Sequence, residues 1–458
     1  MQFAFGFNTG DNEALNIFRA FCMSYHPRED IAQRFAEIHP PLDPLAALVE
    51  ANRCLYCFDA PCTAACPTHI DVPRFIKKIA TGNLRGSATT ILDANILGAS
   101  CSRVCPVDVL CEGACVLHRY NKEPIEIGRL QRHAMDHFYS IGAKLPFAPI
   151  SERGVKVACI GAGPASLACA AELRKHGYGV TIFESRPLPG GLNTYGVAEY
   201  KLRPSDSLRE VELVKSLGVE FRFGVSVGRD ITVEELERSH AAIFLAVGLG
   251  PADPLGLPGD TLIPVVDALR FIADYKTAQA ASVGRKVAVI GGGNTAIDAA
   301  NAALRLGAEE VYMIYRRGEP EMPAFQFEYE NAKLEGVRFR FQTQPVAIRA
   351  DGLECVRMEL GAPDQSGRRK PEPVAGSNFL IECDMVIPAI GQSRFLEFLS
   401  EFRGVELRDG NVAVDPETGR TSNPRYYAGG DCVNGGREVV DAVAEGKRAG
   451  AAIAKWLT

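Results

Sequence analysis

Long apolar runs, a surplus of one charge sign and grouped histidines are all missing from this 458-residue sequence. No stretch approaches the roughly 20 apolar residues of a membrane-spanning helix, which predicts a protein without a membrane span. Fifty Lys and Arg face 56 Asp and Glu, so the charge gives no reason to expect nucleic acid or an anionic membrane as a partner. The first residues lack a basic segment and a sustained apolar core, which argues against a signal peptide. We therefore expect a cytoplasmic protein.

Cysteine, by contrast, is abundant: the chain has 14, and eight of them lie between Cys54 and Cys115. The two groups read Cys54-x2-Cys57-x4-Cys62-x3-Cys66-Pro67 and Cys101-x3-Cys105-Pro106-x4-Cys111-x3-Cys115. Such short spacings let several thiolates converge on a soft metal centre, and a proline directly after a cysteine also occurs in bacterial ferredoxins. A reducing compartment disfavours disulfides, and Cys54 with Cys57 would supply only half of a structural zinc site. We predict two 4Fe-4S clusters.

The spacings indicate that these cysteines bind clusters, but they do not determine which cysteines share a cluster. In two-cluster ferredoxins the last cysteine of a run binds the other cluster. The simplest arrangement gives Cys54, Cys57 and Cys62 to one cluster, which a cysteine of the second group completes. Cys66 then belongs with the other cluster.

A strand, a glycine-rich turn and a helix begin at Val155 and predict a first dinucleotide site. The turn needs Gly161 for its tight bend, and Gly163 lets the backbone approach a pyrophosphate at the N-terminus of the helix. The next strand ends in Glu184, 23 residues after Gly161, where a carboxylate would bind a ribose hydroxyl. The residues expected at this site are Gly161, Gly163, Pro164, Ala165 and Glu184.

Two further motifs identify the first dinucleotide as FAD. Gly191 and Leu192 follow the first unit closely, whereas Gly430 and Asp431 lie some 270 residues after the glycine-rich turn. An Asp at a strand end can accept a hydrogen bond from the ribityl chain of FAD, and the helix expected over 438–450 can direct its N-terminus at the flavin. An FAD domain that is interrupted by an insertion explains the distance between these motifs.

The same strand-turn-helix pattern returns at Lys286 and predicts a second nucleotide site. By register with the first unit, the position of the ribose-binding acid falls at Tyr315, and two arginines follow it. A carboxylate there would favour NAD, whereas cations favour the 2′-phosphate of NADP, so we favour NADP(H) and keep NAD(H) as the alternative. The expected contacts are Gly291, Gly293, Asn294, Thr295, Arg316 and Arg317.

The sequence thus predicts an α/β protein with an N-terminal α-helical iron–sulfur domain and two doubly wound dinucleotide-binding domains, the NAD(P) domain being inserted in the FAD domain. The expected boundaries are 1–150 for the helical domain, 151–280 with 396–458 for the FAD domain, and 281–395 for the NAD(P)H domain. Near the N-terminus, apolar residues at 15, 18, 22 and 25, and again at 31, 35 and 38, recur with helical spacing and predict two packing helices. No Cys-x-x-Cys lies near the flavin motifs, so we do not expect a disulfide reductase.

At this point the chain resembles a known family over roughly residues 45–458. The segments Arg53–Cys62, Cys66–Thr68 and Leu110–Cys115 are similar to the N-terminal half of dihydropyrimidine dehydrogenase and its bacterial NAD-dependent flavin subunit, and more distantly to the glutamate synthase small subunit. The ending, from Val414 to Asp431, is close to the same family. The five residues between Cys105 and Cys111 favour the pyrimidine branch.

The resemblance implies specific ligands and a role. It implies that Cys54, Cys57, Cys62 and Cys115 hold one cluster, and that Cys66, Cys105, Cys111 and the side-chain oxygen of Gln131 hold the other. Cys101 would then be a spare thiol near the site. The chain would be an electron-input subunit without catalytic side chains of its own, in a hetero-oligomer with an FMN-containing subunit that reduces uracil and thymine, or runs in reverse. The alternatives are a glutamate synthase small subunit or another NAD(P)H–ferredoxin oxidoreductase, and, in a different class, a redox-sensing or assembly scaffold.

Overall fold

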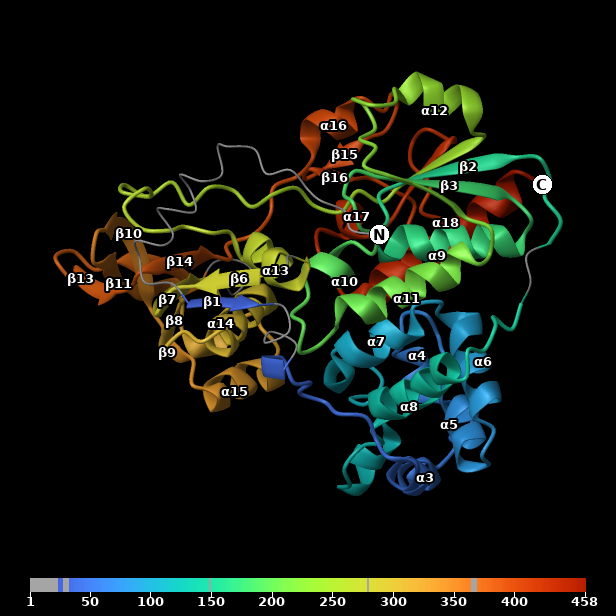
Figure 1. The fold of residues 1–458 in the computed structure, drawn as a ribbon, viewed down its shortest axis with the longest axis horizontal. Helices are drawn as coiled ribbons and strands as arrows, with labels where there is room; N and C mark the ends of the chain where they lie inside the picture. The colour runs from blue at the N-terminus through green and yellow to red at the C-terminus, as the bar shows by residue number, and fades with distance from the viewer. Residues whose placement is uncertain (1–23, 28–32, 148–149, 278–279, 364–368) are drawn as a thin grey trace. The chain divides into compact units, whose positions relative to one another are not determined.

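The computed structural model describes residues 24–27, 33–147, 150–277, 280–363 and 369–458 (Figure 1). The chain divides into two compact units. One comprises 37–195, 199–251 and 393–458, and it contains both the helical domain and the FAD-type sheet. The other comprises 1–36, 196–198 and 252–392, and it contains the second nucleotide-binding sheet. None of the helices in the described part of the chain is long and apolar enough to cross a membrane.

The helical domain is built from short helices whose apolar faces are continuous with one core. In α5 (Val72–Ala80), Val72, Phe75, Ile76 and Ile79 are buried at the i, i+3, i+4, i+7 spacing of an amphipathic helix. The Asp71 carboxylate caps the helix by accepting from the Arg74 backbone N–H at 3.1 Å. The other elements are α3 (Pro44–Arg53), α4 (Pro61–Ala64), α6 (Leu84–Ala94), α7 (Gly98–Val104), η1 (Val107–Val109), η2 (Val116–Tyr120) and α8 (Ile127–Ser140).

The FAD-type sheet has five parallel strands in the order β17-β5-β2-β3-β4. Its strands are β2 (Lys156–Ile160), β3 (Gly179–Glu184), β4 (Glu220–Phe223), β5 (Ala242–Leu245) and β17 (Tyr426–Ala428). Tyr426 pairs with Ile243 although some 180 residues separate them in the sequence, so the C-terminal segment completes the sheet that the first dinucleotide motif begins. This pairing confirms the interrupted domain that the sequence predicts.

Two helices of this sheet approach each other through small residues. They are α9 (Pro164–Lys175), which follows the first glycine-rich turn, and α18 (Val439–Trp456). A Cβ on Gly446 would lie 2.0 Å from the carbonyl oxygen of Ala165, and one on Gly450 would lie 2.8 Å from that of Cys169. Only glycine permits this approach, which draws the C-terminal helix against the FAD-type motif.

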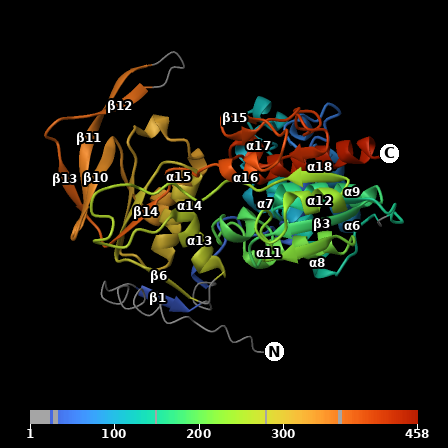
Figure 2. The ribbon, with the colours of Figure 1, turned by 90° about the horizontal axis from the view of Figure 1, so that it is seen from above.

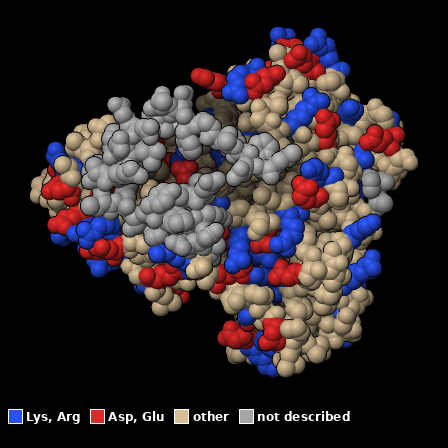
Figure 3. Space-filling model, in the orientation of Figure 1, with Lys and Arg blue, Asp and Glu red and all other residues tan. Residues whose placement is uncertain are grey.

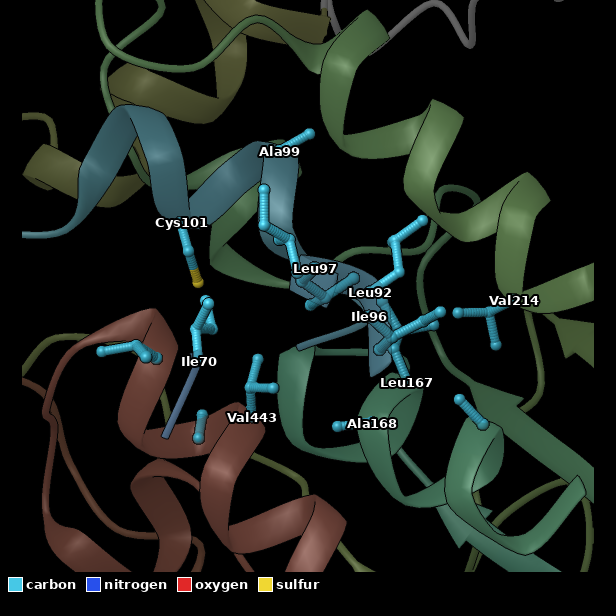
Figure 4. Close-up of a cluster of buried hydrophobic side chains, with 14 of the residues drawn as sticks. Ile70, Leu92, Ile96, Leu97, Ala99, Cys101, Leu167, Ala168, Val214 and Val443 are labelled. Atoms are coloured by element: carbon cyan, nitrogen blue, oxygen red, sulfur yellow. The ribbon is translucent and has the colours of Figure 1, made fainter. Parts of the chain in front are cut away.

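The remaining elements of this unit connect the strands. They are α10 (Leu192–Tyr195), α11 (Pro204–Lys215), α12 (Val233–Ser239), α16 (Leu396–Ser400), β15 (Leu407–Arg408), β16 (Asn411–Val412) and α17 (Asp431–Asn434). The helical domain and the FAD-type sheet share one hydrophobic core: Leu92 and Leu97 of the helical domain lie near Leu167 of α9 and Val443 of α18 (Figure 4). The iron–sulfur segment is therefore anchored directly on the flavin-binding elements.

The other unit contains a four-stranded parallel sheet in the order β14-β7-β8-β9. An antiparallel sheet of β10, β11, β12 and β13 accompanies it (Figure 2). The parallel-sheet elements are β7 (Lys286–Ile290), α14 (Asn294–Arg305), β8 (Glu310–Ile314), α15 (Gln326–Glu335), β9 (Arg338–Arg340) and β14 (Met385–Pro388). The other elements are α13 (Ala268–Thr277), η3 (Glu319–Glu321), β10 (Thr343–Arg349), β11 (Gly352–Pro363), β12 (Arg369–Pro373) and β13 (Phe379–Glu382).

The prediction of two N-terminal packing helices is wrong at Tyr25, and the second helix is shorter than predicted in the residues that can be compared. Tyr25 lies in a strand, β1 (Ser24–Pro27), which pairs antiparallel with β6 (Ala280–Val283), so pairing with a distant segment decides its structure. The other predicted positions of that helix, 15, 18 and 22, lie outside the described residues. Residues 33 and 34 of the second predicted helix are helical, whereas residues 35–38 are not. Phe35 is fully buried, and its ring lies tilted against that of Tyr275 with 4.8 Å between the ring centroids.

Candidate functional site

Four cysteines from both sequence groups line the first of two pockets in the helical domain. Cys54, Cys57, Cys62 and Cys115 surround a space of about 380 Å³, and the rest of its lining is apolar. Thiolates around a single zinc ion all lie about 2.3 Å from the metal, yet no three His, Cys, Asp or Glu of the described residues converge closely enough to hold one ion. The donor set and its wider spacing fit a multi-iron cluster.

Backbone geometry holds this first pocket open. Tyr56 and Ala60 adopt left-handed conformations, with φ of 52° and 36°, and so turn the chain sharply between Cys54 and Cys62. The Tyr56 hydroxyl donates to the Ala51 carbonyl at 3.0 Å, which fixes the loop to the end of α3. Burial raises the pKa of the Cys62 thiol to about 12, so this thiol stays protonated until it binds a metal.

A second pocket, of about 350 Å³, lies between α7, α8 and the loop after α4. Three of its predicted ligands, Cys66, Cys105 and Cys111, line it together with the Gln131 side chain. Gln131 is buried, and its Nε2 donates to the Gly98 carbonyl at 2.7 Å, so Oε1 is the amide atom suited to bind iron.

Cys101, which is expected to be a spare thiol near the site, also lines this second pocket. Its side chain is 3% exposed, and it lines the pocket together with Cys105. The four-residue separation places both thiols on one side of α7, and this helical spacing is the signal that could have identified Cys101 as a pocket residue. The second pocket therefore offers five candidate ligand side chains.

One buried and one half-buried carboxylate fix the helices that carry these ligands. Glu210, from α11 of the FAD-type sheet, accepts from the backbone N–H groups of Ala99 and Ser100 at 2.8 and 3.1 Å, and from the Ser100 hydroxyl. Glu112 accepts from the Gly128 N–H at the start of α8 at 2.9 Å. Burial raises the pKa of each carboxyl to about 7, while these N–H donors favour its ionised form. Both helix N-termini are thus capped from outside their own helix.

The FAD-type motif forms an open cradle at the start of α9. Gly161 has a φ of +92°, and a Cβ there would lie 2.4 Å from the Ala246 carbonyl oxygen. At Gly163 a Cβ would find nothing nearer than 4.0 Å, which is the space a pyrophosphate needs at the helix N-terminus. Gly191 faces Gly163 across this space, and a Cβ on Gly191 would lie 2.9 Å from the Gly163 Cα. Pro164 and Ala165 begin α9, and Leu192 begins α10.

Acidic residues of the FAD-type site also stabilise its loops. Glu184 ends β3, and its two oxygens accept from the backbone N–H groups of Ala162 and Arg186, each at 2.8 Å. A carboxylate retains further lone pairs, so this bonding leaves it able to accept from a ribose hydroxyl. Asp431 begins α17, where burial raises its pKa, and the preceding Gly430 N–H donates to Glu445 at 2.6 Å.

The second glycine-rich turn is equally open. Gly293 has an extended backbone, and a Cβ there would meet nothing within 4 Å. Asn294 uses its Oδ1 to accept from the Phe325 N–H at 3.0 Å, whereas Thr295 is exposed. Tyr315 occupies the position of the ribose-binding acid: its ring lies against Gly292, and its hydroxyl donates to the Glu321 carbonyl at 2.8 Å.

The two arginines after Tyr315 lie on the surface of the same unit. Arg316 is exposed and Arg317 is half-buried. The Arg317 Nε has no hydrogen-bond partner, and no carboxylate forms an ion pair with either arginine, within the part of the chain that the structure describes. On the face drawn in Figure 3, Lys and Arg are interspersed with Asp and Glu. Two neighbouring unpaired guanidinium groups suit a phosphate.

Comparison with known families matches both parts of the chain. Residues 31–143 match the family described as dihydropyrimidine dehydrogenase domain II, 4Fe-4S cluster. Residues 155–446 match the pyridine nucleotide-disulphide oxidoreductases. These matches confirm the predicted fold class and the predicted cofactors, 4Fe-4S, FAD and NADP(H).

Similar proteins of known name include subunits of different enzymes. The NADP(+)-dependent formate dehydrogenase subunit beta of Moorella thermoacetica is 41% identical over 87% of this chain, which spans only 60% of that relative. The glutamate synthase [NADPH] small chain of Halomonas elongata is 37% identical over 94% of this chain and 95% of its own length. Mycobacterium tuberculosis FprA in complex with NADPH shares the fold, with a TM-score of 0.53 and 21% identity over 66% of this chain and 84% of that chain. The chain belongs to the pyridine nucleotide-disulphide oxidoreductase family, and a 4Fe-4S domain of the dihydropyrimidine dehydrogenase domain II family precedes its flavin domain.

Proposed function

We propose that this chain is the electron-input subunit of a hetero-oligomeric oxidoreductase, oxidising NADPH and delivering electrons through two 4Fe-4S clusters to a partner subunit. The observation that carries the proposal is the anchoring of two cysteine-lined pockets on the FAD-type sheet through one core. When bound, FAD would convert the two-electron oxidation of NADPH into single-electron transfers, which 4Fe-4S clusters accept. The protein groups would bind and orient these cofactors.

Different residues of the chain would bind FAD, NADPH and the two clusters. Gly161, Gly163 and Gly191 would let the backbone approach the pyrophosphate of FAD, and Asp431 would accept from its ribityl chain. Gly291 and Gly293 would let the backbone approach the pyrophosphate of NADPH. The predicted cluster ligands are Cys54, Cys57, Cys62 and Cys115 for the first pocket, and Cys66, Cys105, Cys111 and Gln131 for the second.

The partner we favour is a large subunit of the glutamate synthase type, because a glutamate synthase small chain matches nearly the full length of this chain. The second candidate is the FMN-containing, pyrimidine-reducing subunit, which the 4Fe-4S family match over residues 31–143 and the presence of Gln131 in the second pocket support. Copurification with the tagged chain separates them. A glutamine-hydrolysing partner and NADPH-dependent glutamate formation would support the first, whereas an FMN-containing partner and uracil reduction would support the second.

Nicotinamide preference is expected to depend on the two arginines after β8. We propose that Arg316 and Arg317 bind the 2′-phosphate of NADP(H). Replacing both with serine should raise the KM for NADPH by roughly 10- to 100-fold, about 1.4 to 2.8 kcal/mol, with little change for NADH. Steady-state reduction of an artificial acceptor measures both. Arg338→Ser is the matched control, since Arg338 already pairs with Glu310 and should leave the KM unchanged. An equal loss with NADH would contradict the assignment.

The identity of the fourth ligand of the second cluster can be tested by substitution, because Gln131 and Cys101 both line the second pocket. With Gln131 as the ligand, Gln131→Leu should leave a three-iron cluster and lower total iron from about eight to about seven per chain. Cys101→Ala should then retain all the iron. Iron analysis with electron paramagnetic resonance (EPR) of the oxidised protein distinguishes the two variants, and the reverse pattern would assign the ligand to Cys101.

A further inference from the structure

A buried amide next to the second pocket has only half of its hydrogen-bonding capacity used. Asn95 follows α6 directly and is fully buried, and its backbone N–H donates to the Ile91 carbonyl at 2.8 Å. Its Oδ1 accepts from the Leu97 N–H at 2.9 Å. Its Nδ2 has no hydrogen-bond partner among the residues that the structure describes. Because a backbone N–H must face an oxygen, the bond to Leu97 fixes which end of the amide is the donor.

The unused donor belongs to a residue that lines the pocket of the second cluster. Asn95 shares this pocket with Cys66, Cys101, Cys105 and Cys111. A buried amide N–H without an acceptor costs about 1 to 3 kcal/mol, which is the reason such groups nearly always have a partner. The thiolates and inorganic sulfides of a 4Fe-4S cluster are the acceptors that this pocket would supply.

The first pocket has no counterpart to this amide. Apart from its four cysteines, it is lined by Leu, Pro, Val and Ile side chains only. Hydrogen bonds to cluster sulfur stabilise the reduced, more negative cluster and raise its reduction potential. The second pocket therefore has a hydrogen-bond donor, the Asn95 amide, that the first pocket lacks, and such a donor affects the reduction potential of a bound cluster.

We propose that Asn95 is a positioning residue that donates a hydrogen bond from Nδ2 to a sulfur of the second cluster and thereby raises the reduction potential of that cluster selectively. This inference rests on the proposed function, since it requires a cluster bound in the second pocket. The amide is held by its neighbours on the protein side: Oδ1 by Leu97 and the backbone by Ile91. Nδ2 is therefore the part of the amide that is left to donate on the pocket's lining.

Two substitutions distinguish the role of the Asn95 Nδ2 donor from that of the bond between Asn95 Oδ1 and the Leu97 N–H. Asn95→Asp keeps an oxygen for the Leu97 N–H and replaces the donor with an acceptor, and Asn95→Ala removes both. Asn83→Ala is the matched control: the Asn83 Oδ1 accepts from the Gly86 N–H at 2.9 Å in the same domain, but Asn83 is exposed and does not line either pocket. The first cluster serves as an internal reference within every variant.

An EPR-monitored redox titration of the full-length, anaerobically purified chain measures both midpoint potentials. We expect both Asn95 variants to shift the second cluster to a more negative potential, with the first cluster and Asn83→Ala unchanged. Unchanged potentials in both variants, with two intact clusters, would overturn the role of Asn95 and leave the proposed function standing. A wild-type chain with iron for only one cluster would overturn the second cluster itself, and the Asn95 inference with it.

Discussion

Cys62→Ala is expected to lose one of the two 4Fe-4S clusters, with bound iron and acid-labile sulfide falling by about half. Cys62 lines the first pocket with Cys54, Cys57 and Cys115, and alanine supplies no ligand in its place. The glycine-rich turns are untouched, so NADPH should still bleach the flavin, while electron delivery to the partner subunit should be lost. Colorimetric iron and sulfide analysis, followed by anaerobic NADPH titration, tests both parts.

The control for this substitution is Cys355→Ala. Cys355 is a fully buried thiol of β11 in the other unit, and like the other 12 cysteines among the described residues it forms no disulfide. Removing it should lower stability but leave iron and sulfide at their full values. Full iron content in Cys62→Ala would contradict the assignment of the first pocket.

Gly163→Val and Gly293→Val are expected to abolish different cofactor interactions in chains that still fold. Both glycines have extended backbones that valine also adopts, with φ of −79° and −94°. A Cβ on either would meet no protein atom nearer than 4.0 Å, so the added side chain would occupy the space left for a pyrophosphate. The two variants therefore form a matched pair.

Gly163→Val should be purified almost without FAD. Gly293→Val should retain FAD fully, but its affinity for NADPH should fall by roughly 100-fold, or about 2.8 kcal/mol. Absorbance of the released flavin and anaerobic reduction by NADPH measure the two effects, and circular dichroism checks that both chains are folded. Loss of FAD from Gly293→Val with retention in Gly163→Val would reverse the assignment of the two domains.

The elements that local sequence determines could be predicted well. Glycine-rich turns between a strand and a helix depend on a few neighbouring residues, and the structure places Gly161 at a positive φ and Gly163 in open space as that motif requires. The helix over Val72–Ala80 follows from its apolar spacing. The interruption of the FAD-type domain could also be predicted, because Gly430 and Asp431 form a motif that follows a strand of the FAD-type sheet.

Features that depend on distant segments could not be predicted. Tyr25 lies in a strand because residues 280–283 pair with it, which no local pattern indicates. Asn95 lines the second pocket just before α7, whose first turn is held by Glu210 from more than 100 residues away, and no local pattern indicates this. The identity of the partner subunit is a property of a surface, and spacing motifs inside the chain carry little information about it.

We propose that electrons from NADPH reach the clusters through the flavin of this chain. The direct measurement is rapid anaerobic mixing of the holoprotein with NADPH, with flavin absorbance and freeze-quenched EPR spectra recorded over time. We expect the flavin to bleach first and a reduced 4Fe-4S signal to follow within the same turnover. A bleached flavin without any cluster signal, in protein whose clusters dithionite does reduce, would contradict it.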